Sequence, residues 1–154
     1  MVIRLRASPF NNTIIQAYAP TSDYDGDAVE DFYDHLQEIL DQSPKKDILV
    51  VLGDWNAKVG EDAFKNWKGT CRRCCNPETN ERGLRLLEFA CYNDLVLANA
   101  LSKHQASRRW TWHSPNGGYD NQIDYITVRR RFMTSVNTAK TRSFRGVDIG
   151  SDHD

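Results

Sequence analysis

The sequence contains no long apolar run and few cysteines, and each shortage narrows the class of protein. No stretch approaches the roughly 20 apolar residues that span a bilayer. The start of the chain, Met1 to Arg6, lacks the charged head and apolar middle of a signal peptide. The 4 cysteines are unevenly spaced, which favours reduced thiols over a disulfide framework. These features predict an intracellular protein, nuclear or cytoplasmic, that is neither secreted nor membrane-bound.

The pattern of cysteines also disfavours a structural zinc site. Residues 71–75 contain a single Cys-x-x-Cys pair, Cys71 and Cys74, followed by Cys75. A second such pair, or a pair of histidines at the usual spacing, is missing. Free thiols are therefore the better interpretation of this segment.

Charge is unevenly distributed, although the net charge is only −1. Residues 1–60 carry 5 basic and 10 acidic groups, residues 61–100 carry 6 and 6, and residues 101–154 carry 9 and 5. A basic C-terminal third is compatible with a bound polyanion, but an ordinary solvated surface would carry the same charges. A chain of 154 residues has room for one domain.

Hydrophobic periodicity predicts an α/β domain with a mixed sheet. We expect two helices, over residues 28–42 and 81–92, the first beginning with a capping box from Asp27 to Glu30. Residues 57–79 have no period and are predicted to form a long surface loop. The expected strands are a pair within residues 1–19 with a turn at 8–12, residues 48–52, residues 95–98, and residues 109–112 and 121–128 across a turn.

Polar residues follow the most apolar of these strands. Asp54 and Asn56 come directly after the run 48–52, which is apolar throughout and therefore expected to be buried on both faces. In an α/β protein this is where a rigid strand presents polar groups to a crevice. The same residue types also favour an ordinary turn, so both interpretations stay open here.

Asp124 is a second candidate. Strand alternation places it on the same side as Ile126 and Val128, the side expected to face the core. A buried carboxylate needs a partner, because leaving it unpaired would cost several kcal/mol or force its protonation. That partner is either His153, a metal ion, or one of the arginines at 129–131 in a structural salt bridge.

Aromatic and basic residues alternate just before this segment. Trp110 and Trp112 follow Arg108 and Arg109. Such a set suits contact with a nucleic-acid backbone or stacking on an unpaired base. Large aromatics on strands also commonly pack in the core, so this alternative remains open.

Four ordered motifs resemble the endonuclease/exonuclease/phosphatase superfamily. They are Tyr18-Ala19-Pro20-Thr21, Gly53-Asp54-Trp55-Asn56, Asn121-Gln122-Ile123-Asp124-Tyr125-Ile126 and Gly150-Ser151-Asp152-His153. Residues 80–89 and 111–115 further resemble its LINE-type retrotransposon endonuclease branch. The resemblance covers nearly the whole chain and is weakest over residues 57–79. It implies an α/β fold of the α+β type, a two-sheet sandwich flanked by helices as in deoxyribonuclease I-like proteins.

The resemblance also implies catalytic roles. Asp54 would orient or deprotonate the attacking water, and Asn56 would help to hold that water and the phosphate. Tyr18 would contact the scissile phosphate. His153, paired with Asp124, would donate to a nonbridging phosphate oxygen. These groups suit a reaction that must activate water and stabilise negative charge on phosphorus.

A metal cofactor and a DNA partner are implied as well. The cofactor would be Mg²⁺ or Mn²⁺, bound by Asp152 directly or through water. Arg109 and Trp112 are the expected nucleic-acid contacts. A reverse transcriptase domain is expected in the parent polyprotein.

The sequence departs from the superfamily at both ends. No glutamate precedes Glu30, and the chain stops at Asp154. We therefore expect residues 1–154 to form a partial domain, lacking the N-terminal metal-ligand segment and the closing C-terminal strand, so that the sandwich is incomplete. The expected function is Mg²⁺-dependent DNA nicking, impaired in this chain. The alternatives are a non-catalytic module that binds DNA or protein, and a phosphatase acting on a small phosphoester.

Overall fold

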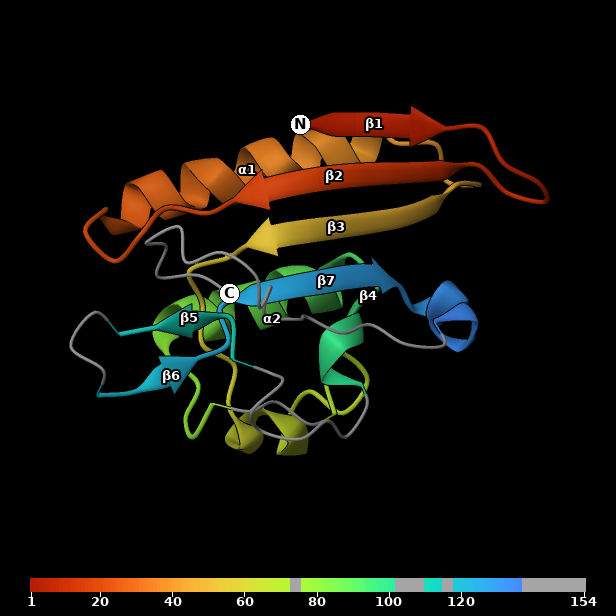
Figure 1. Cartoon of the computed structure of the whole chain (residues 1–154). Helices are drawn as coiled ribbons and strands as arrows, with labels where there is room; N and C mark the ends of the chain where they lie inside the picture. Colours follow the sequence, from red (N-terminus) through yellow and green to blue (C-terminus); the bar gives the residue numbers. More distant parts are fainter. Residues whose placement is uncertain (73–75, 102–109, 115–117, 137–154) are drawn as a thin grey trace, which may run out of the picture.

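The computed structural model describes residues 1–72, 76–101, 110–114 and 118–136, and shows a mixed sheet with helices on one side (Figure 1). The main sheet has strand order β1-β2-β3-β7-β4. β2 and β3 are parallel, while the other neighbouring pairs are antiparallel. The strands of this sheet are β1 (Val2–Leu5), β2 (Asn12–Tyr18), β3 (Ile48–Asp54), β4 (Leu95–Leu97) and β7 (Asp124–Arg129).

A second, smaller sheet pairs β5 (Trp112–His113) with β6 (Asp120–Asn121). The helices are α1 (Gly26–Gln42) and α2 (Glu81–Tyr92), with short 3-10 helices η1 (Glu61–Lys65), η2 (Ala98–Ala100) and η4 (Arg130–Ser135). The predicted α/β class with two sheets and flanking helices is confirmed. In the described part of the chain, neither α-helix is long and apolar enough to cross a bilayer.

The main core lies between the sheet and the two helices, which lie behind it in Figure 1. α1 joins the parallel strands β2 and β3, as the geometry of a parallel pair requires. The predicted capping box is wrong, because Asp25 caps α1: its side chain accepts a hydrogen bond from Ala28 N at 3.0 Å. Asp27 lies in the first turn, where its negative charge interacts favourably with the helix dipole.

The buried face of α2 leaves out part of the apolar residues of this helix. Leu84, Glu88 and Cys91 point to solvent, whereas the buried residues are Gly83, Leu86, Leu87, Phe89 and Ala90. Gly83 explains the orientation, since a Cβ there would lie 2.0 Å from the carbonyl oxygen of Lys58. The first turn of α2 packs directly on the chain that follows β3.

The described residues of the segment 57–79 form only in part the surface loop that their lack of period predicted. Ala57, Val59, Ala63 and Cys71 belong to the main core. Asn76 is fully buried and donates to the carbonyl oxygens of Val59 and Gln122 and to the Tyr125 hydroxyl. This side chain supplies the hydrogen bonds that allow an irregular segment to be buried.

The other face of the main sheet is covered by neither α1 nor α2 (Figure 1). Strand alternation places Ile14, Val50, Leu52 and Ile126 on this face, and all four are half-buried. Strand β1 forms the edge of the sheet, and all four of its residues are exposed. Part of the apolar sheet surface therefore faces away from the main core.

Candidate active site

Three of the predicted side chains come together at one edge of the main sheet. The parallel register pairs Tyr18 with Asp54, and the antiparallel register pairs Asp54 with Asp124. This row lies where β2 and β3 end and β7 begins, at the left in Figure 1. Tyr18 is 71% exposed and Asp54 is 9% exposed. Alternation turns all three side chains to the face without α-helices, because their neighbours Ala17 and Tyr125 are buried in the main core.

Gly53 allows β2 and β3 to meet closely at this edge. Its φ angle is +148°, a conformation that side chains rarely adopt. A Cβ at this position would lie 1.9 Å from the carbonyl oxygen of Ala17 on β2. The glycine therefore permits the close approach that sets Asp54 beside Tyr18.

Asn56 completes the turn after β3 and orients Asp54. Its φ angle is 47°, in the left-handed region that asparagine tolerates better than most residues. The backbone N–H of Asn56 donates to Asp54 Oδ1 at 2.8 Å, and its side-chain amide donates to the carbonyl oxygen of Ala19 at 2.8 Å. The two interpretations offered by the sequence are thus compatible, since a turn holds the carboxylate at the edge.

Asp124 is only half-buried, although Val128 on the same side of β7 is buried in a second, smaller core cluster with Val96 and Ala98. Tyr125 and Thr127 are the fully buried residues of β7, with 0% exposure. They point toward the helices, whereas Asp124 and Ile126 point to the opposite face. The alternation was predicted correctly, and the side of Asp124 does face a core cluster, although the opposite side is more deeply buried.

The arginines at the far end of β7 have other partners. Arg130 forms an ion pair with Asp94 at 2.7 Å, and Arg129 donates to the carbonyl oxygen of Lys45 at 3.0 Å. Arg131 donates to the same carbonyl oxygen. These contacts disfavour the alternative in which one of the three arginines forms a structural salt bridge with Asp124.

Two buried residues that the sequence did not single out fix the start of β7. The hydroxyl oxygen of Thr111 accepts from Ile123 N at 3.1 Å and from Asp124 N at 3.2 Å. The Asn99 amide donates to the carbonyl oxygen of Asp124 at 3.0 Å and accepts from Ile126 N at 3.2 Å. Asn99 follows a buried strand, the same signal that identified Asn56, and could have been found in this way.

The remaining predicted site residues are only partly described. Asp152, His153 and Arg109 lie outside the described residues, so the predicted pairing of Asp124 with His153 stays a prediction. Trp110 and Trp112 are both half-buried rather than core residues. Trp112 pairs with Asn121 across the small sheet.

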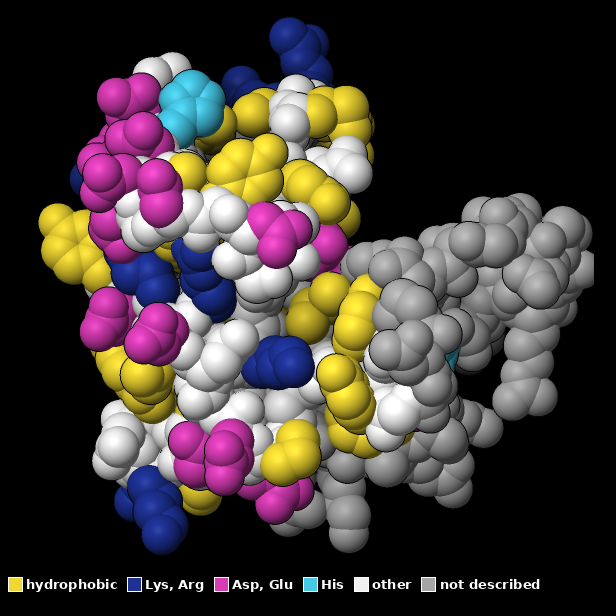
Figure 2. Space-filling model, turned by 90° about the vertical axis from the view of Figure 1, so that its left-hand side faces the viewer, with side chains coloured by type: hydrophobic (Ala, Val, Ile, Leu, Met, Phe, Trp, Pro, Cys, Tyr) yellow, Lys and Arg dark blue, Asp and Glu magenta, His cyan; other side chains and the backbone are white. Residues whose placement is uncertain are grey.

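Acidic and basic side chains lie on different parts of the surface around this edge, which Figure 2 shows end-on. Acidic side chains gather over α1, at the upper left of the view. The helix has six exposed acidic residues, Asp27, Glu30, Asp31, Asp34, Glu38 and Asp41. Beyond Asn56, the Lys58 ammonium lies 5.9 Å from the centre of the Tyr119 ring. A polyanion would be repelled by α1 and attracted toward the Lys58 side.

The donor atoms at this edge suit a hard cation. Carboxylate and amide oxygens are the ligands that Mg²⁺ prefers, and this ion often takes only one or two carboxylates along with water and phosphate. The described residues contain no group of three or more His, Cys, Asp or Glu that could hold a metal. They can therefore offer at most Asp54 and Asp124. Glu30 is engaged elsewhere, in an ion pair with Arg85 at 2.7 Å.

Comparison with known proteins identifies relatives of this chain. The family described as Endonuclease-reverse transcriptase matches residues 12–154. The chain is 46% identical over 151 residues to craniofacial development protein 2 of Bos taurus and 44% identical to that of Tragulus javanicus. These alignments cover 98% of the chain and 25% of each relative. The chain thus spans about a quarter of the length of these relatives.

Solved structures show the same fold at low sequence identity. The 3'-5' exonuclease NExo from Neisseria meningitidis matches with a TM-score of 0.65 and 18% identity, over 99% of this chain and 61% of that chain. The endonuclease domain of TRAS1, a telomere-specific non-LTR retrotransposon, matches with a TM-score of 0.55 and 15% identity, over 86% and 51%. These structures show a shared fold, and the family model that matches residues 12–154 shows that the chain belongs to the Endonuclease-reverse transcriptase family of the endonuclease/exonuclease/phosphatase superfamily.

Proposed function

We propose that this chain is the catalytic part of a Mg²⁺-dependent endonuclease of the retrotransposon type, which nicks DNA at the edge formed by Tyr18, Asp54 and Asp124. The observation that carries the proposal is the strand register, which aligns these three side chains across three adjacent strands. Asn56 holds the Asp54 carboxylate in place through its backbone N–H. Rigid strands thus present a base, a phenol and a second carboxylate on one face.

Each group has a role in hydrolysis of a phosphodiester. Asp54 accepts the proton of the attacking water, whose oxygen bonds to phosphorus while one bridging P–O bond breaks. The Tyr18 hydroxyl, on an exposed side chain, donates to the scissile phosphate. Asp124 orients His153 so that this imidazole donates to a nonbridging oxygen. The products are one phosphate monoester and one hydroxyl end.

The cofactor that fits the oxygen donors is Mg²⁺, with Mn²⁺ as an alternative. It would be held by Asp152, directly or through water, with Asp124 nearby, and would neutralise negative charge that develops on the phosphate. Zinc is not proposed. The structure describes two of the cysteines, and they differ in position: Cys71 is buried, whereas Cys91 is exposed on α2.

DNA would approach from the side away from α1. The acidic surface of α1 repels a phosphate backbone, whereas Lys58 lies two residues beyond Asn56 and carries positive charge. Trp112 on the small sheet offers a half-buried ring for a base or sugar, and Arg109 adds a basic group. NExo from Neisseria, solved with a product DNA hairpin, shares this fold with a TM-score of 0.61.

The family description and the length of the relatives support a larger parent protein. The matched family is described as Endonuclease-reverse transcriptase, and the chain covers 25% of the curated relatives. We therefore include a reverse transcriptase domain in the proposed parent polyprotein.

A plasmid-nicking assay with Mg²⁺ tests the proposal. We expect slow nicking, which EDTA abolishes and Asp124→Asn reduces at least tenfold. Asp31→Asn, on the exposed surface of α1, is the matched control and should nick like the parent chain. Equal nicking by all three proteins, or nicking that survives EDTA, would contradict the proposal.

The same protein preparations separate the two alternatives. DNA binding that weakens steeply with salt, without nicking by any of the proteins, would favour a non-catalytic module. Release of phosphate from a small ester, without nicking, would favour a phosphatase.

A further inference from the structure

A pocket lies at the end of the sheet opposite the candidate active site. Its volume is ≈ 450 Å³, within the range of about 300–1,000 Å³ that is usual for small-ligand sites. Strand β3 separates it from Asp54, and seven residues at about 3.3 Å each give roughly 20 Å. Among its lining residues are Pro9, Phe10, Asn11, Lys46, Arg131 and Phe132.

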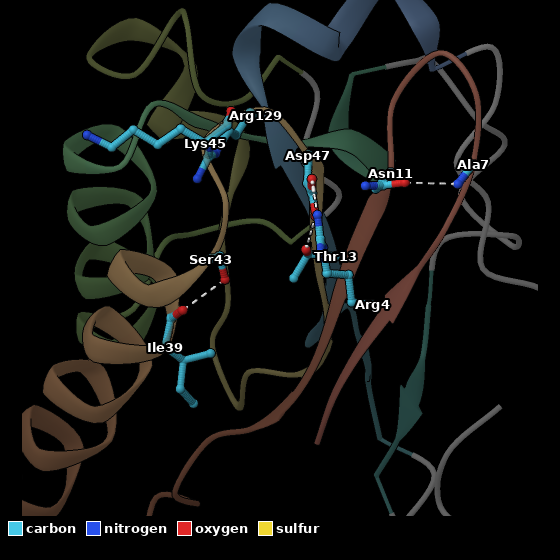
Figure 3. Close-up of polar contacts among 9 residues, drawn as sticks. All are labelled: Arg4, Ala7, Asn11, Thr13, Ile39, Ser43, Lys45, Asp47 and Arg129. Atoms are coloured by element: carbon cyan, nitrogen blue, oxygen red, sulfur yellow. Dashed lines mark hydrogen bonds and ion pairs between the residues drawn. The ribbon is translucent and has the colours of Figure 1, made fainter.

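The pocket has an aromatic wall. The rings of Phe10 and Phe132 meet edge to face, with centroids 5.5 Å apart. The guanidinium of Arg131 lies 4.6 Å from the centre of the Phe132 ring. Phe10 is 46% exposed, which is high for a phenylalanine. The Asn11 side chain accepts from Ala7 N at 3.1 Å and closes the loop that carries Phe10 (Figure 3).

Among the described lining residues, Asp47 is the one carboxylate, and its charge is already balanced by a partner. Asp47 is 2% exposed and accepts from Arg4 at 2.6 and 3.2 Å and from the Thr13 hydroxyl at 2.9 Å. Figure 3 shows the side chains of Arg4 and Thr13 directed toward Asp47. The hydrogen bond from Arg4 is the main reason that the pKa of Asp47 lies below its usual value.

Positive charge therefore dominates the pocket. Lys46 is exposed and forms no ion pair with any described residue. Arg131 likewise has no carboxylate partner within the described part of the chain, and it shares the Lys45 carbonyl oxygen with Arg129. Burial first, and then the nearby Arg131, lowers the pKa of Arg129. An anion bound here would relieve the repulsion between the two guanidinium groups.

We propose that this pocket binds a nucleoside monophosphate, with the base against the Phe10 and Phe132 rings and the phosphate between Lys46 and Arg131. Flat rings bind well on aromatic faces and beside arginine, and two cations suit a phosphate dianion. This ligand combines the two features that the pocket offers, an aromatic wall and unbalanced positive charge. The inference does not depend on the chemistry proposed for Asp54.

Amide-resolved NMR titration tests this site, with dAMP, deoxyadenosine and inorganic phosphate as separate probes. We expect dAMP to bind at least tenfold more tightly than either deoxyadenosine or phosphate, with shifts at residues 7–11, 46–47 and 131–132. Lys46→Ala and Phe10→Ala change exposed side chains, so both should fold and each should weaken dAMP binding at least fivefold. Lys65→Ala, on exposed η1, is the matched control and should bind like the parent chain.

Three outcomes would overturn the proposal. Equal affinity for dAMP and inorganic phosphate would show that the aromatic wall does not contribute to binding. Unchanged binding in both Lys46→Ala and Phe10→Ala would place the ligand elsewhere. Shifts at residues 53–56 without shifts at residues 7–11 would assign dAMP to the candidate active site.

Discussion

Replacing Asn76 should destabilise the fold more than any polar substitution on its surface. The side chain is fully buried and forms four hydrogen bonds within the described residues. Its amide donates to Val59 O at 3.2 Å, to Gln122 O at 2.9 Å and to the Tyr125 hydroxyl at 3.2 Å, and its oxygen accepts from Gln122 N at 3.0 Å. These bonds attach residues 57–79 to the segment that leads into Asp124.

The expected loss follows from these contacts. A hydrogen bond contributes a net of about 0.5–1.5 kcal/mol. The Asn76 amide has two hydrogens for its three acceptors, so two donated bonds and one accepted bond together contribute about 1.5–4.5 kcal/mol. Asn76→Ala should therefore lower the free energy of unfolding by that amount, a large fraction of the stability of a typical domain.

Urea unfolding followed by tryptophan fluorescence measures the difference. Asn66→Ala is the control, because Asn66 is exposed and its substitution should change the free energy of unfolding by no more than about 0.5 kcal/mol. If Asn76→Ala were as small in effect as Asn66→Ala, the buried network would not stabilise this segment and the reasoning would be wrong.

Three further predictions concern the close strand approach, an ion pair and DNA binding. Gly53→Ala should cost about 3 kcal/mol or more in urea unfolding, because its Cβ would meet the backbone of Ala17, whereas Gly26→Ala meets nothing within 4 Å and should stabilise by about 0.4–1 kcal/mol. Glu30→Gln should cost about 0.3–1 kcal/mol at neutral pH, because Arg85 lowers the pKa of Glu30. A carboxylate whose pKa is lowered by folding stabilises the protein at pH values above its unfolded-state pKa, about 4.3. This stability is lost as the pH falls through the folded-state pKa. The parent chain and Glu30→Gln should therefore unfold alike in urea at about pH 2. The logarithm of the DNA association constant should fall linearly with the logarithm of salt concentration, and a flat response in a fluorescence binding assay would count against phosphate contacts.

The sequence was most informative where one local pattern determines the structure. The apolar run before Asp54 predicted a buried strand, and the polar residues after it predicted the edge where Tyr18, Asp54 and Asp124 are now found in register. Both helices were predicted because a 3.6-residue period extends over several turns. Such signals depend only on residues that are close in the sequence, so they can be recognised without knowledge of the fold.

The misses share a different origin. Thr111, Asn99 and Asn76 stabilise the site through partners that are 12 to 49 residues away in sequence. No periodicity reports such a contact, and an asparagine in an irregular segment looks like an ordinary turn residue. The cap of α1 at Asp25 was missed because Asp25 and Asp27, two positions apart in the chain, are both suitable cap residues, and only backbone geometry decides between them.

The central claim is that the edge carrying Asp54 is a hydrolytic site, and single-turnover cleavage of a labelled DNA oligonucleotide in Mg²⁺ tests it most directly. If Asp54 accepts the proton of the attacking water, Asp54→Asn should slow cleavage about 100-fold or more, while Asp31→Asn leaves the rate unchanged. Cleavage by Asp54→Asn at the rate of the parent chain would contradict the assignment of this edge as the active site.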